Sequence, residues 1–111
     1  MTRQVQRLAA MVRLRPEMQE EYLRLHADVW PDVLAQIRRS GLRNYSIFLR
    51  DGLLFSYLEY VGDDLERDLA AMADDPATRR WWELTDPCQE ALPGAVGRSP
   101  WVPMTEVFHA P

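Results

Sequence analysis

Two strand-like apolar runs near the centre of this chain are joined by a turn so short that they must pair with each other. The runs cover residues 44–49 and 53–61, and only Arg50-Asp51-Gly52 separates them. Aspartate followed by glycine favours a tight turn, because glycine readily takes a positive φ. The sequence therefore predicts an antiparallel β-hairpin in the middle of the molecule.

Two helices are predicted before this hairpin. Pro16 suits the first turn of a helix, and apolar residues then follow at spacings of four, three and four: Met18, Tyr22, Leu25 and Val29. Pro31 opens a second helix, because proline suits a first helical position and disfavours helix in the residue before it. We expect this second helix to end at Ser40-Gly41.

Two more helical segments are predicted after the hairpin. One covers about 65–75 and has an apolar side at helical spacing. The other covers about 77–92, carries Trp81 and Trp82, and is limited or kinked at Pro87.

The order of these elements indicates the fold class. A first strand at 5–14 and a last strand at 105–109, which follows a loop at 93–103, complete the order strand, helix, strand, strand, helix, strand. This order predicts a single α+β domain over 1–111 with the ferredoxin-like arrangement, an antiparallel sheet with helices on one face. The other face needs a cover, and the simplest cover is a second copy of the chain, so we predict a homodimer of the dimeric α+β barrel type.

The composition restricts the partners and the compartment. The net charge is -4 with acids and bases interspersed, which argues against a nucleic-acid partner and an anionic membrane surface. There is no apolar run long enough to span a membrane, and the start of the chain, Met1 to Gln4 and then Arg7 and Arg13, is not typical of a secretory signal. Cys88 is the only cysteine, so neither an intrachain disulfide nor a paired-cysteine metal site is expected. We therefore predict a cytoplasmic protein.

A tyrosine and a histidine one helical turn apart are the first candidates for chemistry. Tyr22 and His26 can point into a common volume, and histidine can both give and take a proton near neutral pH. Tyr45 begins a strand after Asn44, a poor strand former, and its hydroxyl is a candidate for binding a ligand at a cavity mouth. The alternative for each residue is structural: a histidine at the edge of the core and a tyrosine packed on the sheet.

Adjacent tryptophans are the second candidate feature. In a helix, Trp81 and Trp82 project about 100° apart, so both cannot enter one core. One ring is expected to anchor the helix, and the other to stack on a ligand or on a partner chain. Flat apolar faces of this kind often hold sugars, which favours a small carbohydrate-handling enzyme that works by proton transfer.

Four further residues carry weaker signals. Trp101 lies in the proline-rich loop, where it could cover the same cavity or reach a partner chain. Glu106 and His109 could imitate a metal site together with His26, but nothing in their spacing brings them together, and no metal is expected. Cys88 has no recognisable catalytic partner nearby and is interpreted as a structural thiol.

Taken in order, several short motifs resemble those of the L-rhamnose mutarotase family. The resemblance covers about Ala9 to the C-terminus and rests on these pieces: Glu21-Tyr22, His26, Trp30-Pro31, Asn44-Tyr45-Ser46-Ile47-Phe48-Leu49, Leu53-Leu54-Phe55, Trp81-Trp82 and Glu106-Val107-Phe108. The chain departs from the family pattern between Pro87 and Met104 and at its last four residues.

The resemblance implies a dimeric protein that needs no metal or organic cofactor and interconverts the α and β anomers of a deoxyhexose. It implies that His26 is the proton donor and that Tyr22, Tyr45, Trp81 and Trp82 bind the sugar. The catalytic base is left open between a tyrosine, whose phenol has a pKa near 10, and a bound water. Two alternatives belong to other classes: a cofactor-independent monooxygenase of the same superfamily, and a ligand-sensing or dimerisation module without activity.

Overall fold

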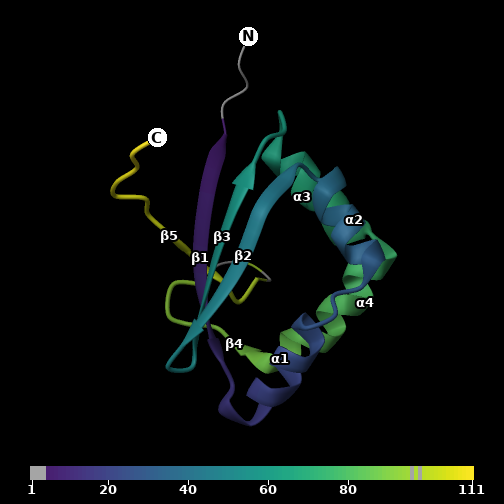
Figure 1. Ribbon diagram of the computed structural model, residues 1–111, viewed down its shortest axis with the longest axis vertical. Helices are drawn as coiled ribbons and strands as arrows, with labels where there is room; N and C mark the ends of the chain where they lie inside the picture. Colours follow the sequence, from purple (N-terminus) through teal and green to yellow (C-terminus); the bar gives the residue numbers. More distant parts are fainter. Residues whose placement is uncertain (1–4, 96, 98) are drawn as a thin grey trace.

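The computed structural model describes residues 5–95, 97 and 99–111. Its centre is a five-stranded sheet in the order β2-β3-β1-β4, with β5 also paired to β1. Helices gather on one side of this sheet (Figure 1). The expectation about a secretory signal rests partly on residues 1–4, which lie outside the described residues.

The elements alternate as the sequence predicts. The strands are β1 (Gln6–Leu14), β2 (Leu42–Arg50), β3 (Leu53–Tyr60), β4 (Gln89–Glu90) and β5 (Val102–Met104). The α-helices are α1 (Gln19–His26), α2 (Pro31–Arg39), α3 (Leu65–Asp74) and α4 (Pro76–Thr85), and two 3-10 turns, η1 (Pro16–Met18) and η2 (Asp86–Cys88), precede α1 and follow α4. Among the described residues, none of these helices has the length and apolar character needed to cross a bilayer.

The predicted hairpin is confirmed. β2 and β3 pair antiparallel up to Arg50 opposite Leu53, so Asp51 and Gly52 alone form the connection. Both residues have positive φ, 52° and 74°, which is the backbone of the two-residue turn that matches the twist of its strands.

The predicted last strand at 105–109 is wrong. The edge of β1 is instead completed by two short strands, β4 and β5, and residues 105–111 have no regular structure. The apolar side chains of Val107 and Phe108, which favoured a strand, are 92% and 80% exposed. The helix predicted at 77–92 is also too long, because the chain turns at η2, where Pro87 takes an early position, and then extends into β4.

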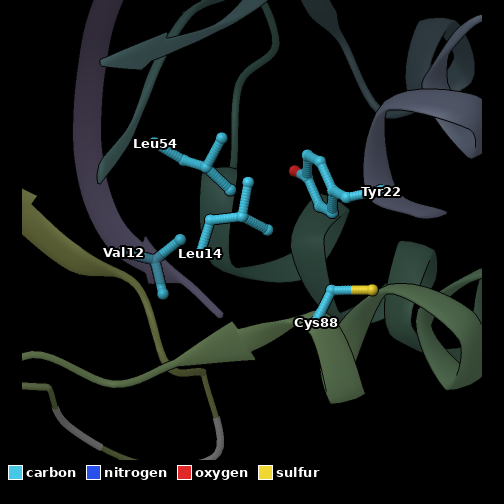
Figure 2. Close-up of a cluster of buried hydrophobic side chains, with 5 residues drawn as sticks. All are labelled: Val12, Leu14, Tyr22, Leu54 and Cys88. Atoms are coloured by element: carbon cyan, nitrogen blue, oxygen red, sulfur yellow. The ribbon is translucent and has the colours of Figure 1, made fainter. Parts of the chain in front are cut away.

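The core lies between the sheet and the helices. A first cluster joins β1 and β3 to α1 and η2 and consists of Val12, Leu14, Tyr22, Leu54 and Cys88 (Figure 2). A second joins α1, α2 and α4 through Leu25, Val33, Ala77 and Trp81, and a third joins the sheet to α3 through Leu42, Tyr60 and Met72. The first and third clusters thus join the helices to the sheet, and the second joins the helices to one another.

The opposite face of the sheet is also apolar. Val12 and Leu54, a cross-strand pair, belong to the core, so the neighbouring pair Met11 and Phe55 points away from the helices. Phe48 pairs with Phe55 on this outer face and is 62% exposed. In the described part of the chain, no helix covers this face (Figure 1).

Candidate active site

A cavity of about 880 Å³ lies between the sheet and the helices, and all five residues predicted to form a site line it. These residues are Tyr22, His26, Tyr45, Trp81 and Trp82. They come from α1, β2 and α4, so only the folded chain brings them together.

His26 is the last residue of α1 and is held by its own helix. Its Nδ1 lies 2.9 Å from the backbone oxygen of Tyr22. A carbonyl oxygen only accepts hydrogen bonds, so this contact assigns the hydrogen to Nδ1 and leaves Nε2 as the nitrogen that can exchange a proton. The half-buried ring therefore presents one proton-exchanging atom.

Aromatic rings fix the orientation of the imidazole. The Tyr22 ring stacks on it with centroids 4.2 Å apart, and the edge of Trp81 meets it at 5.3 Å and 71°. Trp81 is held in turn by Trp30, whose ring lies 5.2 Å away at 74°. Sequence reasoning noted Trp30 only as a motif, because it is the packing of α2, which Trp30 precedes, against α4 that gives it this supporting place.

The two tyrosine hydroxyls remain protonated well above neutral pH. Burial raises the pKa of Tyr22 far above its usual value, although a hydrogen bond with Gln89 opposes the shift. Desolvation by the surrounding protein also raises the pKa of the Tyr45 phenol, although the residue as a whole is 41% exposed. Both phenols can thus donate and accept hydrogen bonds in the cavity as neutral groups. Gln89 gave no signal in the sequence, because it reaches Tyr22 only through the pairing of β4 with β1.

The two tryptophans differ in exposure, as their positions on the helix predict. Trp81 is 6% exposed and belongs to the second core cluster, whereas Trp82 is 36% exposed. Both rings border the cavity. The more exposed ring of Trp82 offers a flat apolar surface to a ligand.

A bulge in β2 determines where Tyr45 lies. The pairing with β3 shifts between Arg43 and Ser46, and Asn44 has a φ of 50°. The Asn44 amide donates a hydrogen bond of 2.8 Å to Glu59. Sequence reasoning marked Asn44 as a poor strand former but did not find Glu59, whose position depends on the register of the sheet.

The weaker candidates lie elsewhere. Trp101 packs against the first core cluster, and Glu106 pairs with Arg7 at 2.8 Å on the far side of the sheet. Cys88 is fully buried in the first cluster. Within the described residues, no group of three or more histidine, cysteine, aspartate or glutamate side chains is arranged to hold a metal ion.

Comparisons with known proteins agree on one family. Residues 7–110 match the family described as L-rhamnose mutarotase. An L-rhamnose mutarotase from Jannaschia sp. (strain CCS1) is 30% identical over 109 residues, which cover 96% of this chain and 100% of the relative.

Solved structures share the fold. The crystal structure of an L-rhamnose mutarotase from Formosa agariphila matches 96% of this chain and 99% of its own with a TM-score of 0.74 and 24% identity. A putative antibiotic biosynthesis monooxygenase from Caulobacter crescentus CB15 matches 81% of this chain and 83% of its own with a TM-score of 0.58 and 12% identity. The predicted α+β, ferredoxin-like fold is confirmed.

Proposed function

This chain belongs to the L-rhamnose mutarotase family, and we propose that it interconverts the α and β anomers of L-rhamnose or a related 6-deoxyhexose as an isomerase. The observation that carries the proposal is the fixed imidazole of His26, whose Nε2 remains free for proton exchange, at a cavity bordered by phenols and indoles. Such a site combines one proton-exchanging group with flat faces that suit a sugar.

The proposed reaction moves protons and breaks one ring bond. His26, protonated at Nε2, gives a proton to the ring oxygen as the bond from that oxygen to C1 breaks. The anomeric hydroxyl loses its proton, and C1 becomes the aldehyde carbon. After rotation about the C1–C2 bond, the ring oxygen attacks the other face of C1 and gives its proton back to His26. The C1 oxygen takes back a proton from the group that accepted the anomeric proton, which regenerates the hydroxyl. The reaction needs no electron transfer.

The phenols suit binding better than proton abstraction. The pKa values of Tyr22 and Tyr45 are raised by burial, so neither phenol is ionised at neutral pH. In this proposal they orient the sugar hydroxyls, Trp81 and Trp82 contact the apolar faces of the sugar, and a water accepts the anomeric proton.

We also propose that two copies of the chain pair through the outer face of the sheet. The apolar Met11, Phe48 and Phe55 support this pairing, because exposed apolar patches commonly mark contact surfaces.

We propose that the protein works in the cytoplasm. Its single cysteine fits this compartment, where disulfides are rare.

The function is tested by NMR saturation transfer on L-rhamnose near neutral pH. The protein should transfer saturation between the two anomeric proton signals well above the uncatalysed level. The His26→Ala variant should lose at least about a hundred-fold of this rate, the usual contribution of a positioned acid or base. A control variant, Leu84→Ala, changes an exposed residue of α4 and should keep the full rate.

Each part of the proposal has an outcome that would contradict it. A folded protein without exchange on any 6-deoxyhexose would overturn the activity. Normal exchange in His26→Ala would remove the role assigned to His26 and leave the activity standing. Oxygen uptake with a quinol, measured with an electrode, would favour a monooxygenase.

A further inference from the structure

The bulge in β2 decides on which face of the sheet Tyr45 lies. Arg43 pairs with Glu59 and Ser46 pairs with Tyr57, so Asn44 and Tyr45 together stand opposite a single residue of β3. Without the extra residue, Tyr45 would pair with Tyr57 and share its face. That face is the outer one, because the pair Ala9–Tyr57 is two residues along from Met11–Phe55, which points away from the helices.

Asn44 makes the bulge possible through its backbone. Its φ of 50° lies in the left-handed region, which most side chains avoid and asparagine tolerates. In this conformation the Asn44 side chain reaches Glu59, and the next residue, Tyr45, points to the helix side of the sheet. Asn44, Tyr45 and Glu59 all border the cavity.

Glu59 holds this conformation in place. Its Oε1 accepts a hydrogen bond from the Asn44 amide at 2.8 Å, and its Oε2 accepts one from the Tyr57 hydroxyl at 2.7 Å. These bonds, helped by the charge of Arg7, keep the pKa of Glu59 below its usual value. Glu59 is therefore an ionised acceptor whose two oxygens both have partners.

We propose that Asn44 and Glu59, which border the cavity beside Tyr45, are positioning residues that act through Tyr45 and set the affinity for the sugar. The inference rests on the proposed function, in which Tyr45 binds the sugar. Neither Asn44 nor Glu59 touches the reacting atoms in this proposal, so their effect is expected in KM and not in kcat.

Variants of Asn44 separate its backbone role from its side-chain role. Asn44→Gly keeps the positive φ and loses only the bond to Glu59, so KM should rise about three-fold. Asn44→Ala loses the bond and strains the bulge, so KM should rise about ten-fold with kcat nearly unchanged. In a Tyr45→Phe background, the same Asn44→Ala change should have a smaller effect on KM, because the two residues act as one unit.

Variants of Glu59 separate its role as a hydrogen-bond acceptor from a general loss of stability. Glu59→Gln keeps an oxygen acceptor for Asn44 and should retain most of the affinity, whereas Glu59→Ala should raise KM as much as Asn44→Gly does. Asp51→Ala is the matched control, because Asp51 is the other non-glycine residue with a positive φ in the same hairpin, at 52°. This control should lower the stability as Asn44→Ala does and leave KM unchanged.

A second readout does not depend on catalysis. In protein with labelled tyrosines, the ring signals of Tyr45 should have the same NMR chemical shifts in the wild type and Asp51→Ala and different shifts in Asn44→Ala. If the wild type accelerates no anomer exchange, the proposed function fails, and these shifts still decide whether Asn44 orients Tyr45. An unchanged KM and unchanged Tyr45 shifts in Asn44→Ala would overturn the inference, as would an equal rise of KM in Asp51→Ala.

Discussion

At the scale of single residues, Tyr22 belongs to both the core and the candidate site. Tyr22 is 2% exposed and lies in the first core cluster, and its hydroxyl is directed toward the strands (Figure 2). The same residue stacks on His26 and supplies the carbonyl oxygen that fixes the His26 tautomer. Tyr22 thus connects the first core cluster to His26, the candidate acid.

The raised pKa of Tyr22 predicts a loss of stability in alkali. In the unfolded chain the phenol ionises near pH 10, whereas in the folded chain it stays protonated to a higher pH. Between these values unfolding releases a proton, so the free energy of unfolding falls by up to about 1.4 kcal/mol per pH unit from this group. Below pH 10 the group has no such effect.

The measurement is urea unfolding between pH 8 and about pH 11, with the wild type compared with Tyr22→Phe. The variant keeps the ring, so its free energy of unfolding should fall less steeply above pH 10. Parallel curves for the two proteins would show that this phenol does not have the raised pKa.

The residues of the site could be predicted to different extents. The helical spacing of Tyr22 and His26 and the adjacency of Trp81 and Trp82 are local, and the sequence alone gave both. The partners Gln89 and Glu59 could not be predicted, because each meets its tyrosine or asparagine only through strand pairing. Local sequence patterns identify a candidate side chain, whereas its hydrogen-bond partner depends on how the strands pair.

At the scale of elements, α4 depends on the residue that caps its start. Asp75 precedes this helix, and its carboxylate accepts hydrogen bonds from the backbone N–H of Thr78 at 2.9 Å and from its hydroxyl at 2.8 Å. These bonds hold the pKa of Asp75 below its usual value. The cap matters for the site because α4 carries both tryptophans.

Asp75→Ala should lower the Tm by about 4 °C, and Asp75→Asn, which keeps a capping oxygen, should lower it much less. Because the folded pKa is depressed, the contribution of the carboxylate is present above the unfolded pKa and is lost as the pH falls through the folded value. The difference in Tm between wild type and Asp75→Ala should therefore narrow below about pH 4. Thermal unfolding followed by circular dichroism tests this, and a constant difference down to pH 2 would contradict it.

The elements themselves were largely predictable, apart from the last strand and the end of the helix predicted at 77–92. The hairpin and the helices follow from turn residues and apolar spacing, which act over short distances. The last strand was misplaced because Glu106-Val107-Phe108 has the composition of a strand, whereas pairing with β1 selects β5 and leaves Val107 and Phe108 exposed. Edge pairing is a property of the whole sheet, so the composition of one segment does not determine it.

At the scale of the whole molecule, the apolar outer face of the sheet predicts self-association. Phe55 lies on central strand β3 and shares this face with Met11 and Phe48. Phe55→Glu should place a charge in the proposed interface without entering the core, and sedimentation at micromolar concentration should change from dimer to monomer. Leu69→Glu, which changes a residue of α3 that is 40% exposed, is the matched control and should stay dimeric. A monomeric wild type would contradict the proposed pairing.

The thiol of Cys88 can report when the core of the protein opens, because a reagent can modify it only then. It is fully buried beside Tyr22 in the first core cluster, and burial raises its pKa, so a thiol reagent can reach it as a reactive thiolate only when this part of the core opens. A ligand that binds only the closed form slows such labelling in proportion to its occupancy. The rate at which Cys88 is modified at increasing sugar concentration therefore yields an affinity for every candidate sugar, including sugars that the protein binds without converting.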